Sequence, residues 1–214
     1  VRIRNCFLRN FDDCVVIKGI VGWDTADNAD ILVEGCVVWC DWGRNLELGA
    51  ETNAPAFWNI LFRNCDCIHG STAFLDIQHH NRADIGQVTF EDIRVEYTKH
   101  QLPDVFQNDM DAPYPTDTPV RHPLLFCLPI YRSGLFAEDG LNGQIHDITF
   151  RNIRILTDAP EVPVPESAFL GLDAEHTVER ICIAGVTCNG KRLATREELR
   201  LHINEFVRDV TILP

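Results

Sequence analysis

Short β-forming phrases of one kind recur along the chain. They are VRIRNC, ILVEGC, ILFRNC, VTFEDI, ITFRNI and ICIAGV, and they begin at Val1, Ile31, Ile60, Val88, Ile148 and Ile181. Each phrase has the form of a three-residue strand, a two-residue corner and the start of a second strand, and IRVEY and IRIL are the clearest continuations. The starts are 30, 29, 28, 60 and 33 residues apart, so the pattern predicts one unit repeated about every 30 residues.

The second corner position of every unit holds a residue that tolerates a left-handed backbone. These residues are Asn5, Gly35, Asn64, Asp92, Asn152 and Gly185. A third short apolar run follows in five units, at Val15–Ile17, Leu46–Leu48, Leu75–Ile77, Phe126–Leu128 and Leu170–Leu172. This organisation predicts an all-β fold, a right-handed parallel β-helix with three strands per turn and about five to six turns. An antiparallel sandwich also has short strands, but it does not require the same corner residue in each unit.

The repeat covers the whole chain, so residues 1–214 are expected to form a single β-helix domain. The 60-residue interval is interpreted as one turn with an inserted loop at 98–123, rich in Pro and Asp. The segment 195–210, TREELRLHINEFVRDV, predicts a capping helix, with Thr195 as N-cap and Glu198 three residues later. Val1 opens directly on a strand, so we expect the chain to be the C-terminal part of a longer β-helix whose preceding turns it contacts.

Nine cysteines could suggest a disulfide framework. Their number is odd, however, and the chain is long enough to be stable without such a framework. Cys6, Cys36 and Cys65 occupy a position that later turns fill with isoleucine or valine, so they are expected to stack in the core. Metal binding by Cys65 and Cys67 is the alternative, but alternation sends both side chains inward. We therefore expect no metal and no other cofactor.

Charge narrows the range of partners. There are 32 acidic and 19 basic residues, a net charge of −13, and no basic patch, which argues against nucleic acid as a partner. The apolar runs fall short of the roughly 18 residues that span a bilayer, and the first residues lack the apolar core of a signal peptide. No membrane partner is expected.

If the third runs point inward, the residues between them point outward. The outward column is then Val16, Glu47, Asp76, Cys127 and Gly171, followed two places on by Lys18, Gly49, Gln78, Pro129 and Asp173. Neighbouring strands lie about 4.8 Å apart, so Glu47 and Asp76 would be adjacent on one exposed face. Asp12 and Asp13 lie at the corner before this face.

The residue types on this face are those of a carbohydrate groove, because sugars bind planar apolar surfaces and bidentate polar side chains. Glycoside hydrolysis needs an acid for the leaving oxygen and a carboxylate to activate water, and adjacent acids raise one pKa. Asp12 and Asp13 are the candidate catalytic residues, although an acidic pair before a strand also serves simply to hydrogen-bond a turn. The candidate substrate-binding residues are Lys18, Arg44, Asn45, Glu47, Asp76, Gln78 and His79, with His80, Trp23, Trp39, Trp42 and Trp58 at the borders.

The run DDCVVIKG resembles the Asp-Asp motif of the pectin-lyase-like β-helix glycoside hydrolases, most closely family 28, the polygalacturonase-like family. The stretch from VVW to IH that follows is similar to family 28 and has features of families 49 and 87. The resemblance implies a secreted or periplasmic hydrolase that inverts configuration, with Asp12 as general acid and Asp13 as one of the residues that hold the water. A third catalytic aspartate of the family lies about one turn earlier and is expected upstream of this chain.

The departures from the family concern the substrate. The family's GHG histidine falls on Arg44 or Asn45, and its RIK motif, which binds a uronate carboxylate, falls on Asp76, Ile77 and Gln78. An acid and an amide in place of two cations would repel a uronate. We therefore expect a neutral or differently substituted glycan rather than unsubstituted polygalacturonate.

Three functions remain open from the sequence. The first is an inverting glycoside hydrolase acting on a polysaccharide or oligosaccharide along the third strands. The second is a non-catalytic glycan-binding β-helix module, and the third is a polysaccharide lyase with Lys18 as base, although Lys18 is also well placed for an ion pair with Asp12 or Asp13. The sequence leaves the oligomeric state open.

Overall fold

The computed structural model of the protein describes residues 1–22, 25–98, 122–132 and 140–214, and within these ranges the chain forms β-strands and no helix. The strands make three sheets. Sheet A contains β1 (Arg2–Arg4), β4 (Asn28–Glu34), β7 (Ala56–Arg63), β10 (Asp84–Glu91), β13 (Gln144–Arg151), β16 (Val178–Ala184) and β20 (Val207–Leu213). Sheet B contains β2 (Phe7–Asn10), β5 (Val37–Cys40), β8 (Asp66–His69), β11 (Arg94–Tyr97), β14 (Arg154–Thr157), β17 (Val186–Cys188) and β18 (Lys191–Leu193). Sheet C contains β3 (Val15–Gly19), β6 (Arg44–Thr52), β9 (Ala73–His79), β12 (Leu124–Pro129), β15 (Ser167–Leu170) and β19 (Leu201–Ile203).

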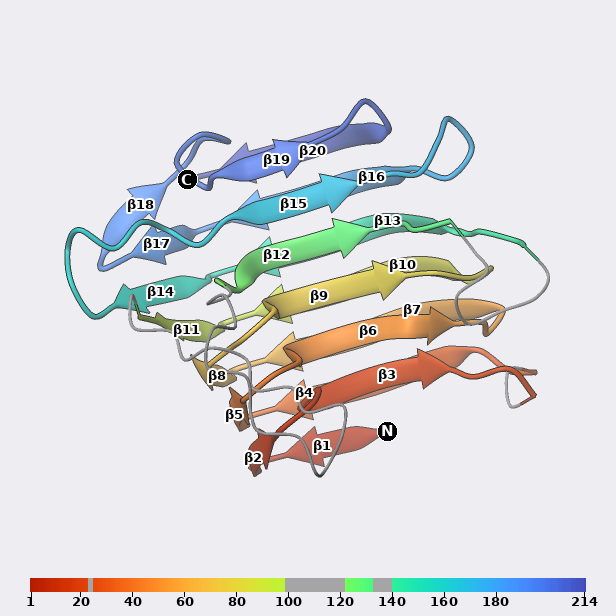
Figure 1. Ribbon diagram of the computed structural model, residues 1–214, viewed down its shortest axis with the longest axis horizontal. Coiled ribbons are helices and arrows are strands. Elements are labelled where there is room, and N and C mark those ends of the chain that lie inside the picture. The colour runs from red at the N-terminus through yellow and green to blue at the C-terminus, as the bar shows by residue number, and fades with distance from the viewer. Residues whose placement is uncertain (23–24, 99–121, 133–139) are drawn as a thin grey trace, which may run out of the picture.

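Successive turns stack in parallel, from the N-terminus at one end of the coil to β19 and β20 at the other (Figure 1). Each strand pairs with the equivalent strand one turn away, as in β4 with β7 and β6 with β9. The β17–β18 pair at the C-terminal end is antiparallel. The predicted all-β parallel β-helix with three strands per turn is confirmed.

The corner between sheets A and B is left-handed in every turn. Asn5, Gly35, Asn64, Asp92, Asn152 and Gly185 have φ between 51° and 67°. Side chains at this corner also stack: Asn152 Nδ2 donates a hydrogen bond to Asp92 Oδ1 at 3.0 Å. At Gly35 a β-carbon would lie 2.6 Å from Asn5 Oδ1, so a side chain there would displace the Asn5 amide. The corner prediction is confirmed at all six positions.

A second left-handed position lies within each longer strand of sheet A. It is filled by Asp30, Asn59, Gln87, Asp147, Arg180 and Asp209, with φ between 50° and 55°. The sequence did not reveal it, because glutamine and arginine are not turn residues and the apolar alternation resumes at once. Hydrogen bonds between turns compensate the unfavourable backbone: Asn59 Nδ2 donates to Asp30 Oδ1 at 2.5 Å, and Arg180 Nε to Asp147 Oδ1 at 2.9 Å.

The core is a column of stacked apolar side chains inside the coil. Phe62 and Phe90 have ring centroids 4.8 Å apart, Phe90 and Phe150 5.3 Å, and Phe126 and Phe150 4.2 Å. Cys36, Cys65 and Cys67 are buried in the same core, and Cys6 packs against it. The prediction that Cys6, Cys36 and Cys65 stack in the core is therefore confirmed.

The predicted capping helix at 195–210 is wrong. Glu198 N donates to Thr195 Oγ1 at 3.1 Å and Ala194 N donates to Glu198 Oε2 at 2.8 Å, so a capping motif does form. It opens a single turn, after which β19 pairs with β15 and β20 with β16. Leu199 joins the core, and Ile203 and Val207 pack against it in one more turn of the coil, because stacking on an existing coil outweighs helix propensity.

The last predicted third strand is shifted by several residues. The side chains of Leu170 and Leu172 were expected to point inward. The strand is instead Ser167–Leu170, and the side chain of Phe169 points inward. Register pairs Cys127 with Ala168, so Gly171 and Asp173 lie outside the predicted outward columns. The bulkier Phe169 takes the inward position and leaves Leu170 exposed. Most of the expected insertion at 98–123 lies outside the described residues.

The left-handed corner predicts a substitution pattern at Asn64, which is exposed and has φ of 51°. Asn64→Val should destabilise the protein by about 1–2 kcal/mol, since β-branched side chains disfavour this backbone. Asn64→Gly should have little effect. Thermal unfolding measures both, with Thr89→Val on the neighbouring regular strand as control. Equal melting temperatures for the valine and glycine variants would contradict the interpretation.

Candidate functional site

Asp12 and Asp13 lie at the corner that leads from sheet B into β3. Asp13 N donates a hydrogen bond to Asp12 Oδ1 at 3.0 Å, and Arg44 N from the next turn donates to Asp13 Oδ1 at 3.0 Å. Gly43 permits this approach: a β-carbon there would lie 2.4 Å from Asp13 Oδ1 and 2.7 Å from Asp12 Oδ1. The two carboxylates thus rest against the backbone of the following turn, with Asp12 exposed and Asp13 half-buried.

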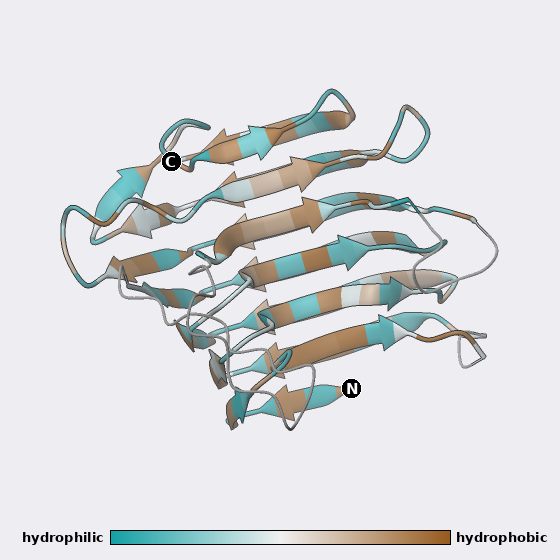
Figure 2. Ribbon diagram, viewed as in Figure 1, coloured by the Kyte–Doolittle hydropathy of each residue, from teal (hydrophilic) through white to brown (hydrophobic). Residues whose placement is uncertain are grey.

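Glu47 and Asp76 are direct neighbours on the outer side of sheet C. Register pairs Val16 with Glu47, Glu47 with Asp76, and Asp76 with Cys127. In Figure 2 hydrophilic bands interrupt β6 and β9, whereas β12 is apolar along most of its length. The expected adjacency is correct, but the expectation of an exposed face is wrong. Glu47 is 0% and Asp76 1% exposed.

Arg44 holds this group of acids together. Its Nε lies 3.1 Å from Asp76 Oδ2 and 3.8 Å from Glu47 Oε1, and its Nη1 lies 4.0 Å from Asp13 Oδ1. We call Asp13, Arg44, Glu47 and Asp76 the acid cluster. One cation therefore faces three carboxyl groups. Three carboxyl oxygens of the cluster, both of Glu47 and Oδ1 of Asp76, have no hydrogen-bond partner of good geometry among the described residues.

This arrangement shifts the proton affinities of the buried acids. Burial first, and then the charges of Asp76 and Asp13, raise the pKa of Glu47 to about 10. Burial also raises the pKa of Asp76, to about 7, although Arg44 opposes the shift. The raised pKa favours the protonated form of Glu47 at neutral pH, which lowers the negative charge next to Arg44.

Four predicted binding residues fall outside the acid cluster. Lys18 pairs with Glu51 at 2.6 Å rather than with Asp12 or Asp13. Asn45 is buried and donates through Nδ2 to His69 O at 2.8 Å. His79 is buried with Nδ1 2.7 Å from Thr52 Oγ1, and burial lowers its pKa to about 3.

Gln78 is half-buried on the outer side of β9, one register step from Gly49. Asn45 and His79 thus hold corners of the coil and do not line the face, because the chain turns at both ends of each third strand. Gln78 keeps the predicted orientation.

Two of the predicted border residues, His80 and Trp42, stack on aromatic side chains that the sequence had not singled out, Tyr131 and Phe11. The rings of His80 and Tyr131 stack with centroids 4.5 Å apart, and burial together with the Arg44 charge lowers the pKa of His80. Trp42 stacks on Phe11 at 6.1 Å near the Asp12 corner. Tyr131 follows the third strand by two residues, and the sequence carries no signal that would pair it with His80.

The other predicted aromatic borders are spread over the coil. Trp39 lies on sheet B, where the Arg9 guanidinium is 5.0 Å from its ring centroid. Trp58 lies on sheet A and its Nε1 donates to Asp27 at 3.0 Å, while Trp23 lies outside the described residues. Trp39, Trp42 and Trp58 therefore do not line one groove.

In the described ranges, no group of three or more His, Cys, Asp or Glu side chains is arranged to hold a metal ion. Nor does that part of the chain contain a helix with the length and hydropathy of a membrane span. Comparison with protein-family models, with curated proteins and with solved structures found no match to this chain.

The raised pKa of Glu47 predicts how stability depends on pH. A buried acid whose folded pKa lies above its ordinary 4.5 stabilises the fold when protonated, and this contribution is lost as pH rises toward about 10. Glu47→Gln should therefore stabilise the protein at pH 8 by at least about 1 kcal/mol, or roughly 2–4 °C in melting temperature, and much less at pH 4.

Thermal unfolding across this pH range tests the prediction, with Glu34→Gln as matched control. Glu34 is an ion-paired acid on sheet A, 2.6 Å from Arg63 Nη2, and is not buried. A Glu47→Gln variant destabilised equally at both pH values would show that the carboxylate is ionised and paired in the native state.

Removal of Arg44 should have the opposite effect. Arg44→Gln removes the guanidinium that lies 3.1 Å from Asp76 Oδ2 and 3.8 Å from Glu47 Oε1, and it leaves the buried acids without a cation. We expect a loss of about 1–3 kcal/mol, since breaking a buried pair from one side is costly. Urea unfolding at pH 7 measures it, and an unchanged midpoint would mean that the pair contributes nothing.

Proposed function

We propose that the protein is a glycoside hydrolase, or the C-terminal part of one, which cleaves a polysaccharide bound along sheet C. The observation that carries the proposal is the convergence of Asp13, Glu47 and Asp76 on Arg44, directly beside the exposed Asp12. Hydrolysis of a glycosidic bond uses two carboxyl groups in different protonation states. The cluster adjoins the corner at which Asp12 and Asp13 would act as these two groups.

Within this proposal Asp12 acts as general acid, because it is the exposed member and lies where a glycosidic oxygen can approach. Asp13 helps to hold the attacking water, and its orientation is fixed by the hydrogen bond from Arg44 N. Glu47 and Asp76 influence the charge around Asp13 and Arg44 and do not touch substrate, since both are buried. Inversion of configuration is the outcome that the family resemblance implies.

The charge of the cluster favours a neutral glycan. With Glu47 protonated, Arg44 still faces the carboxyl groups of Asp13 and Asp76 next to the exposed Asp12, and the chain as a whole carries a net charge of −13. A uronate approaching this face would meet like charge in a poorly solvated site. A neutral sugar would meet hydrogen-bond acceptors without that repulsion.

The ion pair of Lys18 with Glu51 weakens the lyase alternative, because a lyase base must be free to accept a proton. A non-catalytic glycan-binding module is the second candidate. The near-complete burial of Glu47 and Asp76 favours it, because buried acids reach a substrate only through their neighbours.

Single amide substitutions of the two corner aspartates test the hydrolase. In the full natural chain, Asp12→Asn and Asp13→Asn should each lower turnover by about 10²–10⁴-fold, the usual contribution of a positioned acid or base. Release of reducing ends from a panel of neutral and acidic polysaccharides provides the measurement. Asp66→Asn, a half-exposed acid on sheet B paired with Arg94, is the control.

Unchanged turnover in both corner variants would remove the hydrolase assignment to this site. Binding without turnover by the unaltered protein would favour the glycan-binding module. An unsaturated product would indicate a lyase.

A further inference from the structure

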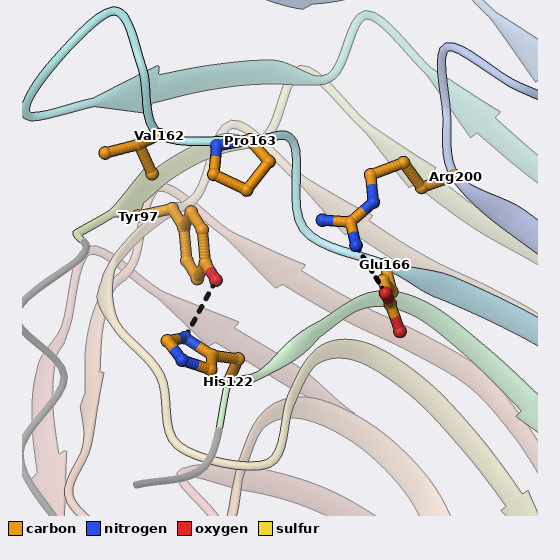
Figure 3. Close-up of a pocket in the computed structure, with 6 residues that line it drawn as sticks. All are labelled: Tyr97, His122, Val162, Pro163, Glu166 and Arg200. Carbon is orange, nitrogen blue, oxygen red and sulfur yellow. Dashed lines mark hydrogen bonds and ion pairs between the residues drawn. The ribbon is translucent and has the colours of Figure 1, made fainter.

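A second recessed site lies at the same corner of the coil, several turns beyond the acid cluster. A hollow of about 410 Å³ is lined by Tyr97, His122, Val162, Pro163, Glu166 and Arg200. Figure 3 shows the Tyr97 ring and Pro163 on one side and the Arg200–Glu166 ion pair on the other. The hollow therefore has an apolar wall facing a polar wall.

This hollow shares lining residues with two others. It shares Tyr97 with a hollow of about 400 Å³ that reaches Trp39 and His69. It shares Glu166 and Arg200 with a hollow of about 420 Å³ that reaches His202. We call the three together the corner groove.

The polar side chains of the central hollow are held in place before any ligand arrives. Tyr97 is 5% exposed, and its hydroxyl lies 3.0 Å from His122 Nδ1. Arg200 Nη1 donates to Val164 O at 2.9 Å and Nη2 to Glu166. Fixed donors and acceptors lower the conformational cost of binding.

The groove lies on the same edge of the molecule as Asp12 and Asp13. His122, Glu166 and Arg200 immediately precede β12, β15 and β19, as Asp13 precedes β3. Backbone hydrogen bonds connect this edge from turn to turn: Cys14 N to Arg44 O, Thr72 N to Gly43 O, and Leu124 N to Thr72 O. The His122 turn is three rungs from that of Asp13, about 14 Å at 4.8 Å per rung, and the Arg200 turn five rungs, about 24 Å.

We propose that the corner groove binds a neutral oligosaccharide, as a distal site for the chain whose scissile bond lies at Asp12 and Asp13. An apolar wall facing fixed polar groups matches a sugar ring, which has apolar faces and a polar rim. Charge is balanced in the central hollow, with Glu166 against Arg200, which gives no preference for an anion. The choice of a saccharide rests on the proposed hydrolase or glycan-binding function.

Calorimetric titration tests the site, with gluco-, manno-, xylo- and galacto-oligosaccharides from disaccharide to hexasaccharide as probes. Oligogalacturonides and an aromatic-rich peptide serve as comparison ligands. Affinity for at least one neutral series should rise with length. His122→Ala and Tyr97→Ala should each weaken binding of the longest member at least tenfold, with Asp66→Asn as control. Because Tyr97 is largely buried, Tyr97→Phe and Pro163→Ala provide variants that retain the packing.

Equal affinity in the His122, Tyr97 and Pro163 variants would overturn the proposal, as would absence of binding or preference for the anionic sugar or the peptide. The experiment is independent of catalysis, because the same titrations are made with Asp12→Asn. Binding that survives in Asp12→Asn but no turnover by the unaltered protein would reject the hydrolase and leave the groove in place. Turnover that depends on Asp12 while groove variants bind normally would reject the groove alone.

Discussion

Parallel stacking of equivalent positions is the constraint on which the rest of this structure depends. Each turn must end its first strand at the same place and with the same left-handed backbone, or the next strand would leave the sheet. Asn64 and Asp92 accept that backbone with little strain, and Gly35 and Gly185 accept it where a side chain would also collide with the turn below. Once this corner repeats, strand pairing and the phenylalanine column follow.

The same stacking forces like residues together when successive turns carry the same charge. Glu47 and Asp76 are register neighbours on parallel strands, so their carboxyl groups cannot separate without breaking the ladder. Two features relieve this repulsion: Arg44 lies against both acids from the start of β6, and the raised pKa of Glu47 favours its neutral form. A regular scaffold thus produces an unusual electrostatic site without backbone irregularity at these two residues.

These features also explain what could be predicted from sequence. The corner residues were visible because asparagine, aspartate and glycine recur at a fixed interval, and Glu47 and Asp76 could be paired by counting along the repeat. The second left-handed column escaped detection because Gln87 and Arg180 give no turn signal of their own. Burial of Glu47 and the inward positions of Asn45 and His79 depend on where neighbouring turns bend. The segment after Thr195 does form a capping hydrogen bond, but pairing of β19 with β15 at the end of the coil determines its structure.

The corner between sheets B and C combines two properties that a linear ligand requires. It carries chemically diverse residues, since corner side chains escape the alternation imposed inside strands, and it repeats with the spacing of the ladder. Asp12 and Asp13 at one end and Tyr97, Glu166 and Arg200 further along are therefore placed on one line by the same backbone hydrogen bonds that build the coil. A polymer lying along that line can contact both without any change in the scaffold. The repeat that stabilises the fold would thus also supply the extended binding edge that we propose.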